Sequence, residues 1–177
     1  MNELALKICK QYIDGLVTAM EATADMRERF KVASKPGFLS DINDTLDMHY
    51  DHGGSQKRLL DVFLADVVEA GGHVELYSGL PDQDMRSFEL QKAFDRKGEA
   101  LKITPKPLTD WKQIPPIIFE DQEDLLKVAE LRGFVAVDPW DEGLEEFLGS
   151  WQTLKESVSD DAWPQQRDQL LAPFVGH

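Results

Sequence analysis

A chain of 177 residues, with 42% hydrophobic and 29% charged side chains, has the composition of a folded globular protein and is long enough to bury a core of its own. Its formal net charge of -14 disfavours nucleic-acid phosphates and anionic membranes as partners. The apolar runs are far shorter than the ~20 residues of a membrane span. The N-terminus lacks a basic segment followed by an apolar one, and there is one cysteine, Cys9, so we expect a cytoplasmic protein.

The first part of the chain is predicted to be helical. Apolar residues recur every three or four positions over residues 3–31, which is typical of a long amphipathic helix. A second helix is expected over residues 40–51, with Ser40 as its N-cap. A third, over residues 56–70, is apolar on most of its circumference, so we expect residues 59–68 to form the most buried helix.

The middle of the chain is less regular. A short strand is expected over residues 73–77, and a fourth helix from Asp82 to about Leu101. Residues 103–116 contain four prolines, which favours a linker between two lobes.

The last third predicts strand, helix, strand and helix over residues 117–119, 121–132, 134–137 and 141–157. Parallel strands joined by a right-handed crossover are the default for such a unit. A short helix is expected after Trp163-Pro164. We therefore predict an α+β fold that is predominantly α-helical, in which a helical lobe (1–101) is followed by a small acidic β-α-β-α lobe (111–177), together forming a single globular domain over residues 1–177.

Metal-binding motifs are weak in this sequence. His49 and His52 are three residues apart and would share one face of a helix, but a zinc or iron site needs further ligands that the motif does not supply. Asp41, Asn43 and Thr45 alternate like calcium ligands, yet the sixth position lacks glycine and the twelfth lacks glutamate. We therefore expect no metal and no cofactor.

Signatures of catalysis are also weak. Residues 53–58 (Gly-Gly-Ser-Gln-Lys-Arg) could bind an anion at a helix N-terminus, although they lack the spacing of a nucleotide-binding loop and are explained by a helix stop and restart. No nucleophile elbow is present, and Cys9 is interpreted as a packed side chain. Carboxylates abound, but with 33 of them their presence alone indicates no site.

Negative charge is concentrated in residues 120–146, which contain ten acidic and two basic side chains. Trp140 lies there in a predicted turn, and an aromatic side chain ringed by carboxylates is typical of an interface with a basic protein. The alternative is that Trp140 covers the end of the small sheet and that the charge serves solubility. The candidate partner-binding residues are Glu123, Asp124, Asp138, Trp140, Asp141, Glu142, Glu145 and Glu146.

These features favour a non-enzymatic acidic protein that binds a basic protein partner and neither nucleic acid nor membrane. Its most concrete form is an inhibitor, such as a bacterial immunity protein that occludes the basic active site of a toxin, because acidic charge accelerates such association. One alternative is an acidic chaperone or adaptor for a protein cargo. Another is an enzyme or metal protein centred on His49 and His52, or one whose site assembles from distant residues.

Overall fold

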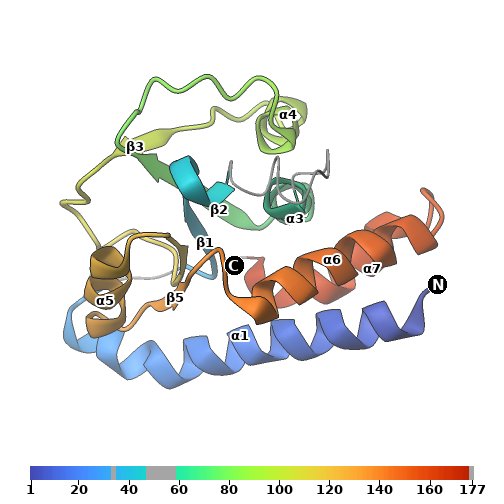
Figure 1. Cartoon of the computed structure of the whole chain (residues 1–177), viewed down its shortest axis with the longest axis horizontal. Coiled ribbons are helices and arrows are strands. Elements are labelled where there is room, and N and C mark those ends of the chain that lie inside the picture. The colour runs from blue at the N-terminus through green and yellow to red at the C-terminus, as the bar shows by residue number, and fades with distance from the viewer. Residues whose placement is uncertain (33–34, 47–58, 176–177) are drawn as a thin grey trace.

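The described part of the computed structural model, residues 1–32, 35–46 and 59–175, contains one sheet of five short parallel strands. The strands are β1 (Gly37–Asp41), β2 (His73–Ser78), β3 (Ile103–Pro105), β4 (Ile117–Phe119) and β5 (Val135–Val137). Their order is β3-β2-β1-β4-β5, so β1 lies at the centre and pairs with β2 on one side and β4 on the other (Figure 1). The carboxyl ends of all five strands therefore point the same way.

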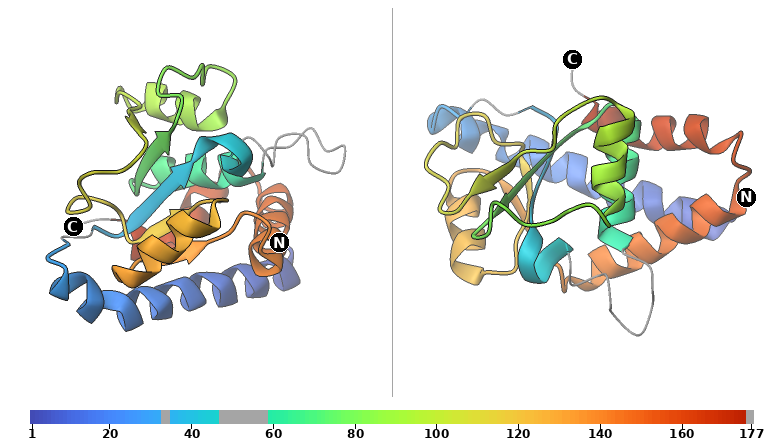
Figure 2. Two further views of the ribbon diagram at one scale, coloured as in Figure 1. Left: turned by 60° about the vertical axis from the view of Figure 1, so that its left-hand side comes forward. Right: turned by 90° about the horizontal axis from the view of Figure 1, so that it is seen from above.

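Six α-helices accompany the sheet in the described residues: α1 (Glu3–Arg29), α3 (Leu59–Glu69), α4 (Glu89–Arg96), α5 (Glu123–Leu131), α6 (Glu142–Ser157) and α7 (Trp163–Leu171). A 3-10 turn, η3 (Ala172–Phe174), follows α7. The long α1 runs beside α6, and α3 packs against α4 (Figure 1). α5 lies apart from α3, α4 and α6, near the C-terminal end of α1 (Figure 2).

The two faces of the sheet pack into two hydrophobic clusters. Phe38 and Leu76 point to the face covered by α1, α3 and α6, where Phe63 contacts Phe147 and Trp151 edge-on. The neighbouring strand residues point the other way, into a smaller cluster under α5 that includes Leu39, Tyr77, Ile118, Ala129 and Phe134. Because both faces are covered, β1 and β4 are buried along their whole length.

The predicted α+β class with a predominance of helix is confirmed. The long first helix, the buried helix α3, the strand at 73–78 and the β4-α5-β5-α6 unit all form where the sequence placed them, and β4 and β5 pair in parallel. The division into lobes at residues 101 and 111 stays a prediction. Strands from both ranges belong to one sheet, since β1 pairs with β4.

The predicted helix at residues 40–51 is wrong where the structure describes it. Residues 37–41 form the central strand, and Ser40 is fully buried in the sheet, donating its hydroxyl to the carbonyl of Asp41 (2.8 Å). The wide turn η1 (Ile42–Leu46) follows, with Asp44 at a positive φ of 59°. All five residues of β1 are buried, so the alternation that marks a half-buried strand is absent.

Two other predicted boundaries also change. The helix expected over residues 82–101 is limited to α4, which Gly98 follows at a positive φ of 68°. Its first amides, those of Glu89 and Leu90, donate to the buried carboxylate of Asp61 in α3 (2.7 and 2.8 Å). The predicted linker 103–116 includes the edge strand β3, where Pro105 ends the pairing.

None of the helices described is both long and apolar enough to cross a membrane.

Candidate functional site

Four strands of the sheet place polar or charged side chains at one edge. Asp41 ends β1 and Ser78 ends β2, while Lys106 follows β3 directly and Glu120 follows β4, with Asp121 next to it. The chain leaves β1 toward β2 on one side and leaves β4 toward β5 on the other. Parallel sheets bind ligands in the crevice where such connections diverge, at the carboxyl ends of the strands. This group of five residues is called the edge cluster below.

Lys106 links the residue that ends β1 to the residue that follows β4. Its Nζ lies 2.8 Å from Asp41 Oδ1 and 3.0 Å from Glu120 Oε2, so one ammonium bridges the ends of β1 and β4. Its backbone amide donates to the carbonyl of Ser78 (3.0 Å), which ties the residue to β2. The Nζ also lies over the ring of Tyr77, 4.8 Å from its centroid.

Glu120 is fully buried, and both of its oxygens have partners. Oε1 accepts from the backbone amides of Asp121 and Gln122 (3.0 Å each). Oε2 accepts from the Tyr77 hydroxyl in addition to the contact with Lys106. Contacts with Tyr77, Lys106 and two backbone amides therefore fix the orientation of this carboxylate.

The turn after β1 adds uncharged polar groups to the same edge. Thr45 Oγ1 donates to Asp41 Oδ2 (3.1 Å), and the Asn43 amide donates to Ser78 Oγ (3.1 Å). Asp41 is 1% exposed and Asn43 is half-buried. Asp41 thus has three side-chain partners, Thr45, Lys106 and Asp121. Its carboxylate is less fully engaged than that of Glu120, which also contacts two backbone amides.

Burial raises the pKa values of Asp41, Glu120 and Asp121 above the ordinary carboxyl range, and for Asp41 the charge of Glu120 raises it further. Burial alone would lower the pKa of Lys106, but hydrogen bonds and charge interactions with Asp41 and Glu120 outweigh it and raise that pKa. Burial and the neighbouring Glu120 also raise the pKa of Tyr77. Two of these carboxyl groups, those of Asp41 and Glu120, thus share the charge of one ammonium.

The same three carboxyl groups have the spacing of metal ligands. One oxygen from each of Asp41, Glu120 and Asp121 lies within 4.8 Å of the others. Ligands on opposite sides of an octahedral Mg²⁺ are about 4.2 Å apart. A divalent cation between them would balance the two negative charges that remain after Lys106 is counted. The three oxygens are therefore close enough for one cation to contact more than one of them.

The predicted partner-binding residues lie elsewhere, around the N-termini of α5 and α6. Glu123, Asp124, Asp138, Asp141, Glu142 and Glu146 are exposed, Glu145 is half-buried, and Trp140 is 54% exposed. Asp138 accepts from the amide of Trp140 (2.8 Å). Asp141 is the N-cap of α6, because it accepts from the amide of Leu144 (2.9 Å). These two acids have local structural roles with no partner present.

The remaining sequence motifs are two histidines, a glycine-rich stretch and the single cysteine. His49, His52 and the glycine-rich stretch 53–58 lie outside the described residues. Cys9 is fully buried, and burial raises the pKa of its thiol to about 12. It is a packed side chain, in agreement with its predicted role.

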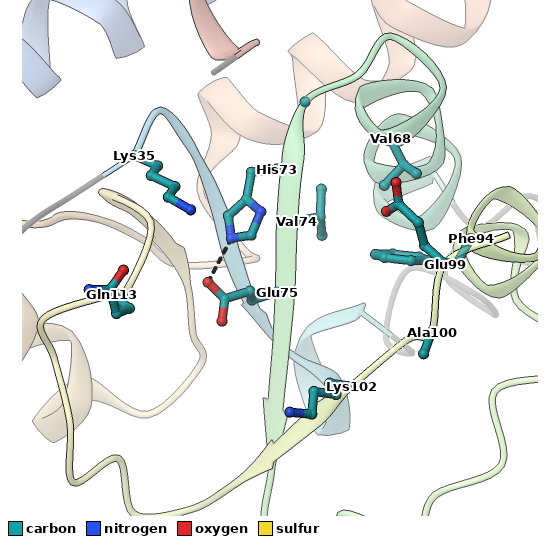
Figure 3. Close-up of a pocket in the computed structure, with 11 residues that line it drawn as sticks. Lys35, Val68, His73, Val74, Glu75, Phe94, Glu99, Ala100, Lys102 and Gln113 are labelled. Atoms are coloured by element: carbon teal, nitrogen blue, oxygen red, sulfur yellow. Dashed lines mark hydrogen bonds and ion pairs between the residues drawn. The ribbon is translucent and has the colours of Figure 1, made fainter. Parts of the chain in front are cut away.

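A pocket of about 390 Å³ lies at the amino end of β2, away from the edge cluster, where β3 no longer pairs with β2 (Figure 3). His73 Nε2 lies 2.8 Å from Glu75 Oε2, within hydrogen-bond distance, on the side of the strand that faces Lys35 and Gln113. Figure 3 shows Glu99 and the apolar side chains on the other side of β2. The polar groups therefore do not converge on one point, and the edge cluster is the better candidate site.

Reasoning from the sequence missed the edge cluster, although part of the signal was present. Glu120 and Asp121 directly follow a predicted strand, and Ser78 follows another. Asp41 was assigned to a helix, and Lys106 to a linker, so the common edge was not recognised.

Comparison of the chain with models of protein families, with curated proteins and with solved structures finds no match.

Proposed function

We propose that this protein is a Mg²⁺-dependent phosphohydrolase, which binds the cation and the phosphoryl group of a phosphate ester at the edge cluster. The observation that carries the proposal is the arrangement of Asp41, Glu120 and Asp121, whose ligand oxygens lie within 4.8 Å of one another, with the ammonium of Lys106 bridging Asp41 and Glu120. It lies at the carboxyl ends of the central strands, where parallel sheets bind ligands.

The proposed cation is Mg²⁺ because of the donor atoms. The donors are carboxylate oxygens, which suit hard cations. In phosphoryl-transfer sites Mg²⁺ is bound by one or two carboxylates and completes its shell with water and substrate phosphate. Asp121 is half-buried, whereas Asp41 and Glu120 are buried, so the open side of the cluster lies toward Asp121 and the solvent.

Phosphate is the proposed substrate group because the neighbouring donors fit its oxygens. Lys106 supplies a positive charge within 3.0 Å of both carboxylates that it bridges. Asn43 and Ser78 contribute an amide and a hydroxyl at the same edge, joined to each other at 3.1 Å. A cation, a lysine and neutral donors together offset the charge that spreads over phosphoryl oxygens during transfer.

Asp41 is the proposed nucleophile. Its carboxylate is the less engaged of the two buried ones, and aspartate carboxylates form acyl phosphates in other phosphoryl-transfer enzymes. The Oδ–P bond forms as the ester P–O bond breaks, and the leaving alkoxide takes a proton from water. A second water then attacks phosphorus, which breaks the Oδ–P bond, restores the carboxylate and releases inorganic phosphate. Glu120 and Asp121 would hold the cation, which would supply positive charge to the phosphoryl oxygens.

The test is hydrolysis of p-nitrophenyl phosphate in Mg²⁺ and in EDTA. We expect activity only with Mg²⁺, loss of about 10³-fold or more in Asp41→Asn, and a phosphorylated Asp41 detected by mass spectrometry after acid quenching. Asp44→Asn is the matched control, since it removes a carboxylate three residues away and asparagine tolerates the positive φ at that position. Undiminished activity in Asp41→Asn, or no hydrolysis of any phosphate ester tried, would refute the proposal.

A second candidate function rests on the exposure of Trp140. We propose that Trp140 with Glu142, Glu145 and Glu146 forms an interface for a basic protein, as in an inhibitor, immunity protein or adaptor. An aromatic side chain that is 54% exposed beside these acids suits such an interface. Its test is the association rate with a captured partner, which should fall when the three glutamates are changed to lysine, whereas Trp140→Ala should mainly speed dissociation.

A further inference from the structure

A pocket of about 190 Å³ adjoins the edge cluster on the face of the sheet that α5 covers. Its apolar wall consists of Leu108, Trp111, Ile118, Leu125, Val128 and Ala129. Whole sites for drug-sized ligands measure roughly 300–1,000 Å³. A pocket of this size therefore accommodates one part of a ligand, such as a single ring.

The pocket and the edge cluster share two residues. Lys106 lines the pocket, and its Nζ contacts Asp41 and Glu120. Tyr77 also lines the pocket, and its hydroxyl donates to Glu120. These two side chains thus contact both the pocket and the carboxylates of the edge cluster.

The shape of the pocket follows from α5. Leu125, Val128, Ala129 and Arg132 recur at the spacing of one helix face, so they form a stripe about 10 Å long. α5 begins shortly after Asp121, and Arg132 caps its far end. One face of α5 therefore bounds the pocket over most of the length of the helix.

The described side chains that line the pocket carry no negative charge of their own. Of the described residues that line the pocket, Lys106 and Arg132 are basic and none is acidic, in a chain of net charge -14. The guanidinium of Arg132 lies over the ring of Trp111, 4.6 Å from its centroid, and that ring contacts Phe134 at 5.5 Å. These contacts keep a flat aromatic wall in place.

We propose that this pocket selects the leaving group of the substrate, and that the substrate class is phosphate monoesters whose alcohol carries an aromatic ring. The inference rests on the proposed function, because the phosphoryl group is placed at the edge cluster. The ring lies between Trp111 and the α5 stripe, next to Lys106. Burying it favours aryl over small alkyl esters.

The experiment compares phenylphosphonate with methylphosphonate, two ligands that are not hydrolysed, by titration calorimetry in Mg²⁺. We expect the wild-type protein to bind phenylphosphonate at least about tenfold more tightly. Val128→Phe, which fills the pocket from a half-buried position, should bring the ratio of the two dissociation constants close to one and leave methylphosphonate binding unchanged. Leu126→Phe is the control, because Leu126 is also half-buried on α5 but does not line the pocket.

The two ligands separate failure of this inference from failure of the proposed function. If methylphosphonate binds in Mg²⁺ and not in EDTA, but wild type shows no preference for the phenyl compound, or Val128→Phe retains it, the pocket does not select the leaving group. If neither phosphonate binds in Mg²⁺, the phosphoryl site itself is refuted, and the inference with it.

Discussion

Asp121→Asn is expected to stabilise the protein in EDTA and to remove its stabilisation by Mg²⁺. The oxygens of Asp41, Glu120 and Asp121 lie within 4.8 Å of one another, and two like charges at that distance repel by about 3.5 kcal/mol at an effective dielectric constant of about 20. Asp121 takes part in two such pairs. Screening by water at this half-buried side chain reduces the net gain on removing its charge to about 1 kcal/mol.

A gain of that size should raise the melting temperature in EDTA by roughly 2–4 °C for a chain of this length. Wild type in Mg²⁺ at about 100 times its dissociation constant should gain about 2.7 kcal/mol, or roughly 5–11 °C. The assay is thermal unfolding followed by circular dichroism, with and without Mg²⁺. A drop in melting temperature for Asp121→Asn in EDTA, or an equal response of both proteins to Mg²⁺, would refute a cation site of this composition.

Asp124→Asn is the matched control for this experiment. It removes an exposed carboxylate from the first turn of α5, where negative charge favours the helix. It should therefore lower the stability in EDTA by a few tenths of a kcal/mol and leave the response to Mg²⁺ unchanged.

Three further predictions concern pH, the core and the backbone. Because burial raises the pKa values of Asp41, Glu120 and Asp121, the folded protein without a cation binds protons more tightly than the unfolded chain. Urea unfolding in EDTA should therefore show that the stability falls as the pH rises from about 4 through the raised pKa values. The affinity for Mg²⁺ should rise over the same pH range. Phe63→Ala should cost about 3–5 kcal/mol in chemical denaturation, since Phe63 is fully buried among aromatic rings; a loss below about 1 kcal/mol would show that the core lies elsewhere. Gly133→Ala should lower the melting temperature by several degrees, because a Cβ there would lie 2.6 Å from the backbone nitrogen of Arg27 at a φ of +89°, and an unchanged melting temperature would contradict that packing.

Local patterns in the sequence were sufficient to predict helices that are buried on one face or that have capping or charged residues at their ends. The amphipathic α1 has basic residues in its last turn, and α6 begins at an aspartate that caps it, so each helix contains the information for its own limits. The β4-α5-β5-α6 unit also has short connections, and adjacent elements then pack together by default.

The central strand β1 could not be predicted from local patterns, because it is stabilised by pairing with strands that are distant in the sequence. β1 is buried on both faces between β2 and β4, so Phe38 and Leu39 show no period of two. Ile42, Leu46 and Tyr50, which follow the strand, have the spacing of one helix face and led to the prediction of a helix. Likewise α4 begins where Asp61, 28 residues away, accepts the amides of its first turn. No local signal marks either boundary.

The candidate site depends on tertiary structure for the same reason. Asp41, Lys106 and Glu120 are far apart in sequence, and only the strand order β3-β2-β1-β4-β5 brings the ends of β1, β3 and β4 to one edge. A chain with 33 acidic side chains offers many sets of carboxylates, and composition cannot distinguish among them. The sequence by itself determined the class of fold and the acidic character of the surface, whereas parallel pairing, through long-range hydrogen bonds, decided which carboxylates are buried together beside a lysine.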